Sequence, residues 1–311
     1  MADTPKSIGI IVPTKNRMAD LEAAVKTLLA QTVLPIEIII VDQSPGMESE
    51  RAVRKLHGEA PAHVRERVEL KYLHDTAIAG AATARNAGIE IATSDVLLFL
   101  DDDVELEKEF VENILAAYAE QPDAVGVSGV ITNYRRAPLP MHLWHKIFFR
   151  GPFYDERQDI YVNAGRLGNS PPIRVSKFTG ALMSFRARAV REHRFDATLK
   201  RGSEGEDVDL CLRMGRDAKL LMTPRARLVH KISTSARARE HWIGSVARGN
   251  SYLYYRHWNH GIRNRLFFQW MKFGMGLIAG YACLRRGSID PWRDYRAAVE
   301  YGKRAAQGLS Y

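Results

Sequence analysis

The chain opens with short apolar runs that alternate with amphipathic stretches. Aliphatic and β-branched residues predominate at positions 7–12, 36–41 and 96–100, and each run has the length of a buried strand. In positions 20–31 and 80–91, leucines and alanines recur every three or four residues, which predicts helices. Strands that alternate with helices of about three turns predict right-handed β-α-β units and a mostly parallel sheet.

The same alternation continues through the first 130 residues and returns after residue 178. Further helices are expected at 48–57 and 108–120, and further strands at 68–74 and 125–131. Later elements are expected as a strand at 178–185, a helix at 207–216, and strands at 219–222 and 227–230. We therefore predict an α/β domain over residues 1–235 and a basic helical extension over residues 236–311.

Residues 133–178 interrupt this pattern. The segment is rich in aromatic residues, among them Trp144, Phe148 and Phe153, and it contains several glycines and the pair Pro171-Pro172. Loops of this length in a compact domain are usually functional or disordered. We predict a long functional loop here.

The most apolar stretch of the chain lies at 266–284. Gln269 and Lys272 interrupt it, so the clean apolar run is shorter than the ~20 residues that a membrane-spanning helix needs. Arginines flank the stretch on both sides, and it contains Trp270, a pattern typical of a helix that lies in a membrane interface. The alternative is a helix that packs on the protein's own core.

The composition is that of an ordinary globular protein. Of 311 residues, 46% are apolar and 26% are charged, which excludes a disordered or collagen-like chain. The two cysteines, Cys211 and Cys283, are too few for a disulfide scaffold and suit a reducing compartment. The first residues lack the pattern of a signal peptide, and we expect a cytoplasmic protein.

The net charge of +9 conceals two electrically different halves. Residues 1–130 carry 12 Lys/Arg against 22 Asp/Glu, whereas residues 131–311 carry 33 against 14. An acidic half suits a metal site, and a basic half suits an anionic partner such as phosphate, an acidic lipid surface or nucleic acid. Positive charge that serves only solubility is the alternative for the second half.

Three adjacent carboxylates, Asp101, Asp102 and Asp103, directly follow the apolar run at 96–100. Their repulsion costs roughly 1 kcal/mol per pair at about 4 Å even in water, and a cation would relieve it. Mg²⁺ and Mn²⁺ prefer carboxylate oxygens and share their coordination shell with substrate phosphates. The alternative is capping of the next helix, for which one Asp is enough. We therefore predict a metal site.

A second acidic pair, Glu206 and Asp207, follows two glycines at the start of the helix expected at 207–216. A carboxylate at a helix N-terminus can act as a general base where a substrate proton lies within hydrogen-bond reach. Simple N-capping is the alternative. His230 ends the last expected strand, and imidazole is a good ligand for Mn²⁺-like ions, so His230 gains a role if the fold brings it beside Asp103.

Polar turns follow the first two expected strands, with Pro13, Thr14 and Arg17 in the first turn and Asp42 in the second. Ligands of parallel α/β sheets bind beyond the carboxyl ends of the strands, so both turns are candidates to hold a nucleotide. Neither turn contains the G-x-G-x-x-G or G-x-x-x-x-G-K-[ST] pattern, which excludes the two commonest nucleotide signatures there.

Taken in order, five segments resemble those of a family 2 glycosyltransferase of the GT-A fold: IIVPTKNR, VDQS, GAATARNAGIEIATSDVLLFLDDDV, GALMSFR and GEDVDLCLR. The resemblance covers residues 6–232. It implies a Rossmann-like, mostly parallel sheet flanked by helices. It also implies inverting transfer of a hexose or deoxyhexose from a UDP, GDP or dTDP sugar to a hydroxyl group, with the 133–178 loop on the acceptor side.

The resemblance assigns roles to individual residues. Asp207 would be the catalytic base, with Glu206 beside it, and Asp103 and His230 would bind Mn²⁺ or Mg²⁺. The nucleotide would be bound by Pro13, Thr14, Arg17, Asp42, Arg85, Asp101 and Asp102. Gly180 and Ala181 would shape the pocket for the sugar and the acceptor.

The C-terminal part is similar to the basic helical tails of bacterial family members that act on lipid-linked or polysaccharide acceptors. We therefore expect a glycan or lipid-linked acceptor in polysaccharide biosynthesis. An anionic membrane surface is a candidate partner, with the protein peripheral on the inner face of the plasma membrane, and no nucleic-acid partner is expected. The Q-x-x-R-W motif of processive synthases is absent, which argues against processive polymerisation.

Two alternatives stay open. A sugar nucleotidyltransferase shares the α/β layout and the need for a metal, but it usually has a glycine-rich basic loop where this chain has Pro13-Thr14. A non-enzymatic protein that binds membranes or nucleic acid through its positive charge is the other alternative.

Overall fold

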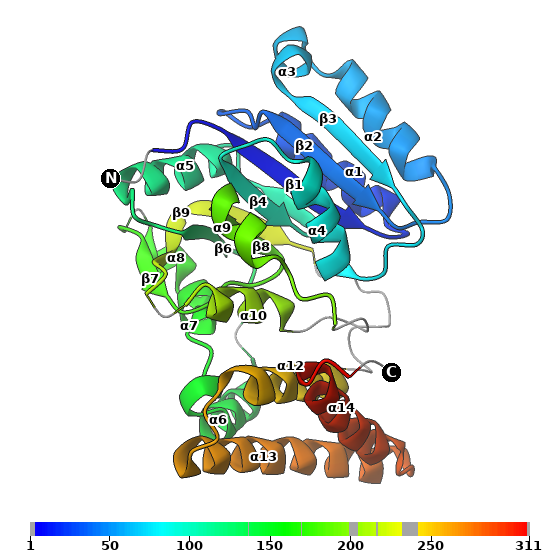
Figure 1. Ribbon diagram of the computed structural model, residues 1–311, viewed down its shortest axis with the longest axis vertical. Helices are drawn as coiled ribbons and strands as arrows, with labels where there is room; N and C mark the ends of the chain where they lie inside the picture. The colour runs from blue at the N-terminus through cyan, green and yellow to red at the C-terminus, as the bar shows by residue number, and fades with distance from the viewer. Residues whose placement is uncertain are drawn as a thin grey trace.

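Figure 1 shows the computed structural model of the chain, which describes residues 4–135, 137–168, 170–198, 205–215, 217–231 and 242–309. Nine strands of the described residues form one sheet in the order β3-β2-β1-β4-β8-β6-β9-β5, with β7 also paired to β9. The strands are β1 (Ile8–Thr14), β2 (Glu37–Asp42), β3 (Glu69–His74), β4 (Val96–Leu100), β5 (Val104–Leu106), β6 (Gly126–Ile131), β7 (Ile173–Val175), β8 (Leu182–Arg186) and β9 (Leu220–His230).

The helices of the first part are α1 (Met18–Leu29), α2 (Glu48–Glu59), α3 (Ala62–Arg67), α4 (Ala81–Ile91) and α5 (Phe110–Glu120). Those of the middle are α6 (Leu139–Phe148), the 3-10 turn η1 (Gly151–Phe153), α7 (Arg157–Val162), α8 (Ala164–Leu167), α9 (Ala187–His193) and α10 (Glu206–Arg213). The C-terminal helices are α12 (Trp242–His257), α13 (Ile262–Arg286) and α14 (Asp290–Ala306).

Six of the nine strands, β1, β2, β3, β4, β6 and β9, run in the same direction. β8 lies antiparallel between β4 and β6, and the short strands β5 and β7 run antiparallel to β9. On the sheet, α4 packs against β1 and β2, and α5 packs against β6 and β9. The predicted α/β architecture, with a mostly parallel sheet, flanking helices and helices at the C-terminus, is confirmed.

The apolar runs form strands because each of them is buried on both faces. Every residue of β1, β2 and β4 is buried, which is why these strands read as continuous apolar runs rather than as alternating patterns. Ile10 lies in register between Ile38 of β2 and Leu98 of β4, at the centre of the main core. Each such side chain contributes ~1.5–3 kcal/mol by leaving water.

The segment 133–178 is not the long loop that the sequence predicts. It contains α6, η1, α7, α8 and β7. Its aromatic residues Phe148, Phe149 and Phe153 are buried in a second apolar cluster with Phe268 and Met271 of α13. The segment is ordered by contacts with helices more than a hundred residues away, which a local pattern cannot reveal.

Two other boundaries differ from the prediction. The strands expected at 219–222 and 227–230 are one strand, β9, which continues past Pro224 because its register with β6 shifts between Ser128 and Val130. The strand expected at 178–185 begins at Leu182, after a tight turn in which Thr179 pairs with Leu182.

The C-terminal helices α12, α13 and α14 gather with α6 at one end of the molecule, below the sheet in Figure 1. Among the described residues, no helix is both long enough and apolar enough to cross a membrane. The domain boundary predicted at residue 235 lies outside the described residues, so the two-part division stays a prediction.

A buried carboxylate fastens this helical group to the rest of the protein. Asp209 of α10 accepts a hydrogen bond from the hydroxyl of Tyr252, and Arg256 Nε and His257 Nε2 lie 3.2 and 2.7 Å from the same Oδ1 atom. Burial alone would raise the pKa of Asp209, but His257 and Arg213 outweigh it and hold the pKa below its usual value. The helix that carries Glu206 and Asp207 is therefore tied directly to α12.

Close packing between α12 and α14 predicts the effect of one small substitution. A Cβ atom at Gly302 of α14 would lie 2.2 Å from the carbonyl oxygen of Arg248, a backbone atom of α12. We expect Gly302→Ala to lower the free energy of unfolding by ~1–3 kcal/mol, measured by thermal or urea denaturation. Gly280→Ala in α13 is the matched control, because a Cβ there meets nothing within 4 Å and alanine favours helix by up to ~1 kcal/mol. Equal stability of the two variants would show that α12 and α14 do not touch in this way.

Candidate active site

Three residues of the kinds that bind metals come together where β4 and β9 end and β5 begins. Asp101 follows β4, Asp103 precedes β5, and His230 is the last residue of β9, directly opposite Val104 in the β5–β9 pairing. One ligand atom of each residue lies within 4.8 Å of those of the other two. The antiparallel pairing of β5 with β9 thus brings His230 beside Asp101 and Asp103. The metal-binding role predicted for His230 depends on a position beside Asp103.

The electrostatics of this cluster suit a divalent cation. His230 Nε2 lies 3.0 Å from Asp103 Oδ1. Burial acts to lower the pKa of His230, but the hydrogen bond and charge of Asp103 outweigh it and raise the pKa. Two carboxylates and one imidazole form a donor set that Mn²⁺-type ions accept. The donor atoms of Asp101, Asp103 and His230 therefore fit the Mn²⁺ or Mg²⁺ ion that the family resemblance implies.

The middle aspartate faces a different way. Asp102 accepts a hydrogen bond from Thr14 Oγ1 at 2.7 Å and another from Arg17 Nη1 at 3.0 Å. Arg17 also approaches Asp103, at 3.3 Å. Burial raises the pKa of Asp102 to about 6, although Thr14 and Arg17 act to lower it. Asp102 therefore anchors the turn after β1 instead of joining the three-residue cluster.

The polar residues at the ends of β1 and β2 are held by strand pairing and by hydrogen bonds to their neighbours. Thr14 and Asp42 face each other in register at the carboxyl ends of the two strands, with Pro13 one position earlier in β1. The Asp42 carboxylate is buried and accepts hydrogen bonds from the backbone N–H of Ser44 and the hydroxyl of Tyr72. These contacts give the rim of the sheet a fixed shape, on which the predicted nucleotide contacts would depend.

A buried arginine joins the two acidic clusters. Arg85 of α4 is 2% exposed and donates to Asp101 Oδ1 at 3.1 Å and to Glu206 Oε1 at 2.9 Å. It also donates to the carbonyl oxygen of Gly180. Burial opposes the charge of Arg85, but the carboxylates of Glu206 and Asp101 more than compensate and raise its pKa. The carboxylates that the sequence separates by about a hundred positions are therefore held around one guanidinium.

The start of α10 presents both acidic residues of the second motif. Gly205 precedes them with φ of 120°, a backbone conformation that favours glycine. The backbone N–H of Gly180 donates to Asp207 Oδ2 at 2.7 Å, which fixes the direction of that carboxylate. Burial raises the pKa of Glu206 to about 7 and the charge of Asp207 adds to this, while Arg85 opposes it.

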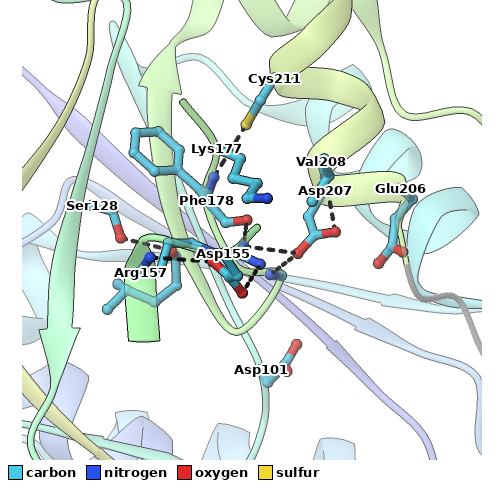
Figure 2. A network of polar contacts seen from close by, with 12 residues as sticks. Asp101, Ser128, Asp155, Arg157, Lys177, Phe178, Glu206, Asp207, Val208 and Cys211 are labelled. Carbon is cyan, nitrogen blue, oxygen red and sulfur yellow. Dashed lines mark hydrogen bonds and ion pairs between the residues drawn. The ribbon is translucent and has the colours of Figure 1, made fainter. Parts of the chain in front are cut away.

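A second network surrounds Asp207 on its other side. Figure 2 shows Asp207 reaching from α10 toward Arg157, which forms an ion pair with Asp155 at 2.8 Å and lies 3.9 Å from Asp207 Oδ2. Burial opposes the charge of Arg157, yet Asp155 and Asp207 raise its pKa above the ordinary value. Burial lowers the pKa of nearby Lys177, whose ammonium donates to the carbonyl oxygen of Tyr154.

Both acidic motifs open onto one cavity of about 1070 Å³. This volume is at the upper end of the range of small-molecule sites. Of the residues predicted from the sequence, those that line the cavity are Arg85, Asp101, Gly180, Ala181, Glu206, Asp207 and His230. The residues that do not line it are Pro13, Thr14, Arg17, Asp42, Asp102 and Asp103.

Sequence reasoning missed several residues of this cavity. Asp155, Arg157 and Lys177 line it, and all three come from the segment that was predicted as a loop. His142 and His145 of α6 also line it. The sequence feature that could have indicated them is the charged and aromatic run FYDER at 153–157. Nothing in its spacing relates it to Asp207.

Comparisons of the chain with known protein families and structures agree with this architecture. The family model described as "Glycosyl transferase family 2" matches residues 9–184, more than half of the chain. The pre-mycofactocin glycosyltransferase of Mycobacterium tuberculosis is 24% identical over 244 residues, which cover 78% of this chain and 46% of that protein. The chain spans less than half of the length of such relatives; for a glycosyltransferase of Escherichia coli the matched share is 33%.

Two solved structures share the fold. The mannosyltransferase PcManGT of Pyrobaculum calidifontis, in complex with GDP-Man and Mn²⁺, superposes with a TM-score of 0.58 at 16% identity and covers 98% of this chain and 87% of its own. TarS 1–349 of S. aureus, in complex with UDP-GlcNAc, gives a TM-score of 0.58 at 15% identity and covers 98% and 84%. At these identities the likeness concerns the fold.

Proposed function

We propose that this chain, which belongs to glycosyl transferase family 2, transfers a sugar from a nucleotide-diphosphate sugar to an acceptor hydroxyl. In this proposal the transfer inverts the configuration at the anomeric carbon. The single observation that carries the proposal is the shared cavity, which has Asp101 and His230 on its wall together with Glu206 and Asp207. When an alcohol displaces a diphosphate from a sugar, a cation stabilises the leaving diphosphate and a base takes the proton of the alcohol. Both groups must therefore face the same cavity.

The donor would be bound where β1, β2 and β4 end. In this proposal the nucleotide lies against the rim formed by Thr14, Arg17 and Asp42, and Asp101, Asp103 and His230 would hold Mn²⁺ or Mg²⁺. A divalent ion held there would neutralise the negative charge that develops on the departing diphosphate. The neighbouring folds that bind GDP-Man and UDP-GlcNAc support a donor of this class, without deciding the base or the sugar.

Asp207 would take the proton of the acceptor hydroxyl. Its carboxylate is directed by the N–H of Gly180, and Arg157 Nη1 lies 3.9 Å from its Oδ2 atom. Arg85 bonds to both Asp101 and Glu206, so Glu206 would help to hold Asp207 at a fixed distance from the donor site at Asp101. As the hydroxyl oxygen bonds to the anomeric carbon, the bond to the diphosphate breaks and the hydroxyl proton passes to Asp207.

The acceptor would enter over the wall formed by α6, η1 and α12. Phe149, Tyr154 and Trp258 line this part of the cavity and offer aromatic faces to a glycan. A glycan or a lipid-linked saccharide is the acceptor class that we propose. The membership in the family favours this activity over the nucleotidyltransferase and the non-enzymatic alternatives.

Ligand-dependent stabilisation tests the proposal. A ligand at about 100 times its Kd stabilises the native state by ~2.7 kcal/mol, so the matching sugar nucleotide with Mn²⁺ should raise the Tm by roughly 5 °C. We suggest a thermal-shift panel of UDP, GDP and dTDP sugars with Mn²⁺, with Mg²⁺ and with chelator. Incubation with nucleoside triphosphates and sugar phosphates serves as the control, because release of pyrophosphate there would identify a nucleotidyltransferase instead. A panel in which no sugar nucleotide shifts the Tm would contradict the proposal.

A further inference from the structure

The outer face of α13 carries a row of exposed apolar side chains. Seven residues spaced three or four apart expose between 43% and 85% of their surface: Ile262, Leu266, Trp270, Phe273, Leu277, Tyr281 and Leu284. This spacing places them on one side of the helix. The opposite side is buried in the apolar cluster through Phe268, Met271 and Met275. Since α13 is apolar both toward the protein and toward water, its outer face is not explained by its own packing.

Helix α6 extends the same surface. Leu139, Leu143 and Ile147 are spaced four residues apart and are 43–69% exposed. Trp270 Nε1 donates to the carbonyl oxygen of Ile147 at 2.9 Å, and the Trp270 and Phe148 rings lie 5.0 Å apart. The two rows therefore meet at Trp270, although α6 and α13 are separated by more than a hundred positions. Both helices lie at the end of the molecule farthest from the sheet (Figure 1). We call these ten residues the apolar face.

The charged side chains on α6 and α13 themselves are of one sign. α13 contains five basic residues and no acidic one, and α6 likewise contains no acidic residue. Arg263 and Arg265 are exposed near one end of α13, and Arg285 and Arg286 are exposed at the other. Lys146 is exposed on α6. An apolar row with arginines at both ends complements a surface that has a hydrocarbon interior and anionic headgroups.

The same charges argue against a second copy of the chain as the occupant. A twofold interface brings the same patch of both subunits together. The basic residues of two α13 helices would then meet beside an apolar contact, with no acidic residue on α6 or α13 to pair with them. Like charges brought together as water is removed oppose association.

We propose that the apolar face of α6 and α13 docks the protein on an anionic lipid bilayer, lying in its interface without crossing it. The other side of α6 carries His142 and His145, which line the cavity. Docking through α6 therefore holds that wall of the cavity close to the lipid headgroups. If the proposed transferase function holds, an acceptor whose saccharide is linked to a membrane lipid would reach the cavity without leaving the bilayer.

Vesicle binding by the full chain tests the proposal. The probes are vesicles of phosphatidylcholine alone and vesicles in which about a third of the lipid is phosphatidylglycerol, the class of anionic surface that attracts basic segments. We expect the protein to float with the anionic vesicles and the triple variant Leu266→Glu, Leu277→Glu, Leu284→Glu to bind at least ~10-fold more weakly. The matched control is Val33→Glu, Ile36→Glu, Ile91→Glu, because these side chains are also exposed (37–41%) but lie between α1 and β2 and at the end of α4, away from α6 and α13. The control should bind like the wild type.

A second variant separates charge from apolar contact. Replacing Arg263, Arg265, Arg285 and Arg286 by Gln should remove most of the preference for anionic over neutral vesicles and the sensitivity to salt. Three outcomes would overturn the proposal: wild type that does not bind either vesicle, a Leu-to-Glu variant that binds as well as its control, or a stable dimer that the Leu-to-Glu variant dissociates. The Tm of each variant shows that it is folded. The sugar-nucleotide shift of the Tm is measured separately, so a failure of docking and a failure of the transferase proposal give different results.

Discussion

Asp207→Asn should reduce turnover ~10²–10⁴-fold while sugar-nucleotide binding persists. This is the range that a positioned general base contributes. An amide cannot accept the acceptor proton, but it has nearly the shape of the carboxylate and can still accept from the Gly180 N–H. The loss should therefore fall on kcat, and the thermal shift produced by the donor should remain.

Two controls make this result specific. Asp123→Asn is the same chemical change on an exposed residue that pairs with Lys219 and does not line the cavity, and we expect it to leave turnover unchanged. The Tm of Asp207→Asn shows whether the local fold survives, because Asp207 also lies 3.9 Å from Arg157. Near-normal turnover of a folded Asp207→Asn protein would remove Asp207 from the mechanism.

Removal of the metal site should abolish transfer. We expect excess chelator to reduce turnover at least ~10²-fold, with recovery on addition of Mn²⁺ or Mg²⁺, since stabilisation of the leaving charge by a metal is worth several kcal/mol. Asp103→Asn should have a similar effect because it removes one of the three ligands of the cluster formed with Asp101 and His230. Binding of Mn²⁺, followed by its paramagnetic signal, provides a measurement that does not depend on activity.

Asp102→Asn is the informative contrast to Asp103→Asn. The carboxylate of Asp102 accepts hydrogen bonds from Thr14 and Arg17 and is not part of the cluster of Asp101, Asp103 and His230. We expect this variant to keep Mn²⁺ binding and to lose ~1–3 kcal/mol of unfolding free energy, the cost of weakening buried hydrogen bonds. Full turnover in excess chelator, or loss of Mn²⁺ by Asp102→Asn but not by Asp103→Asn, would contradict the assignment of ligands.

The parts of the fold that the sequence predicts well are those whose burial is local and repetitive. β1, β2 and β4 are buried on both faces, so their continuous apolar runs identify them without any knowledge of the partners. The carboxylates that follow β4 were recognisable for a related reason. Three in a row directly after a buried strand stand out in the sequence, although the structure pairs Asp102 with Thr14 and Arg17 and pairs Asp101 with Arg85.

The prediction failed for residues 133–178 because their order depends on distant partners. Phe148 packs on Trp270 of α13, Phe153 packs on Tyr254 of α12 and Phe268 of α13, and Trp270 donates to the backbone carbonyl of Ile147 across more than a hundred positions. Arg157, the first residue of α7, likewise lies 3.9 Å from Asp207 at the start of α10, fifty positions away in the sequence. No periodicity within the segment carries that information.

By itself, the sequence determined the α/β class, the family resemblance and the identity of the acidic side chains, because hydrophobic period and short motifs are local properties. Only the tertiary structure decided which of these side chains act together. It bonded Asp102 to Thr14 and left it out of the cluster of Asp101, Asp103 and His230. It placed His230 beside Asp103 through the pairing of β5 with β9, and it gathered Asp101 and Glu206 around Arg85. The physical reason is that a site is defined by distances of a few ångströms, and those are set by strand order and helix packing between segments far apart in the chain.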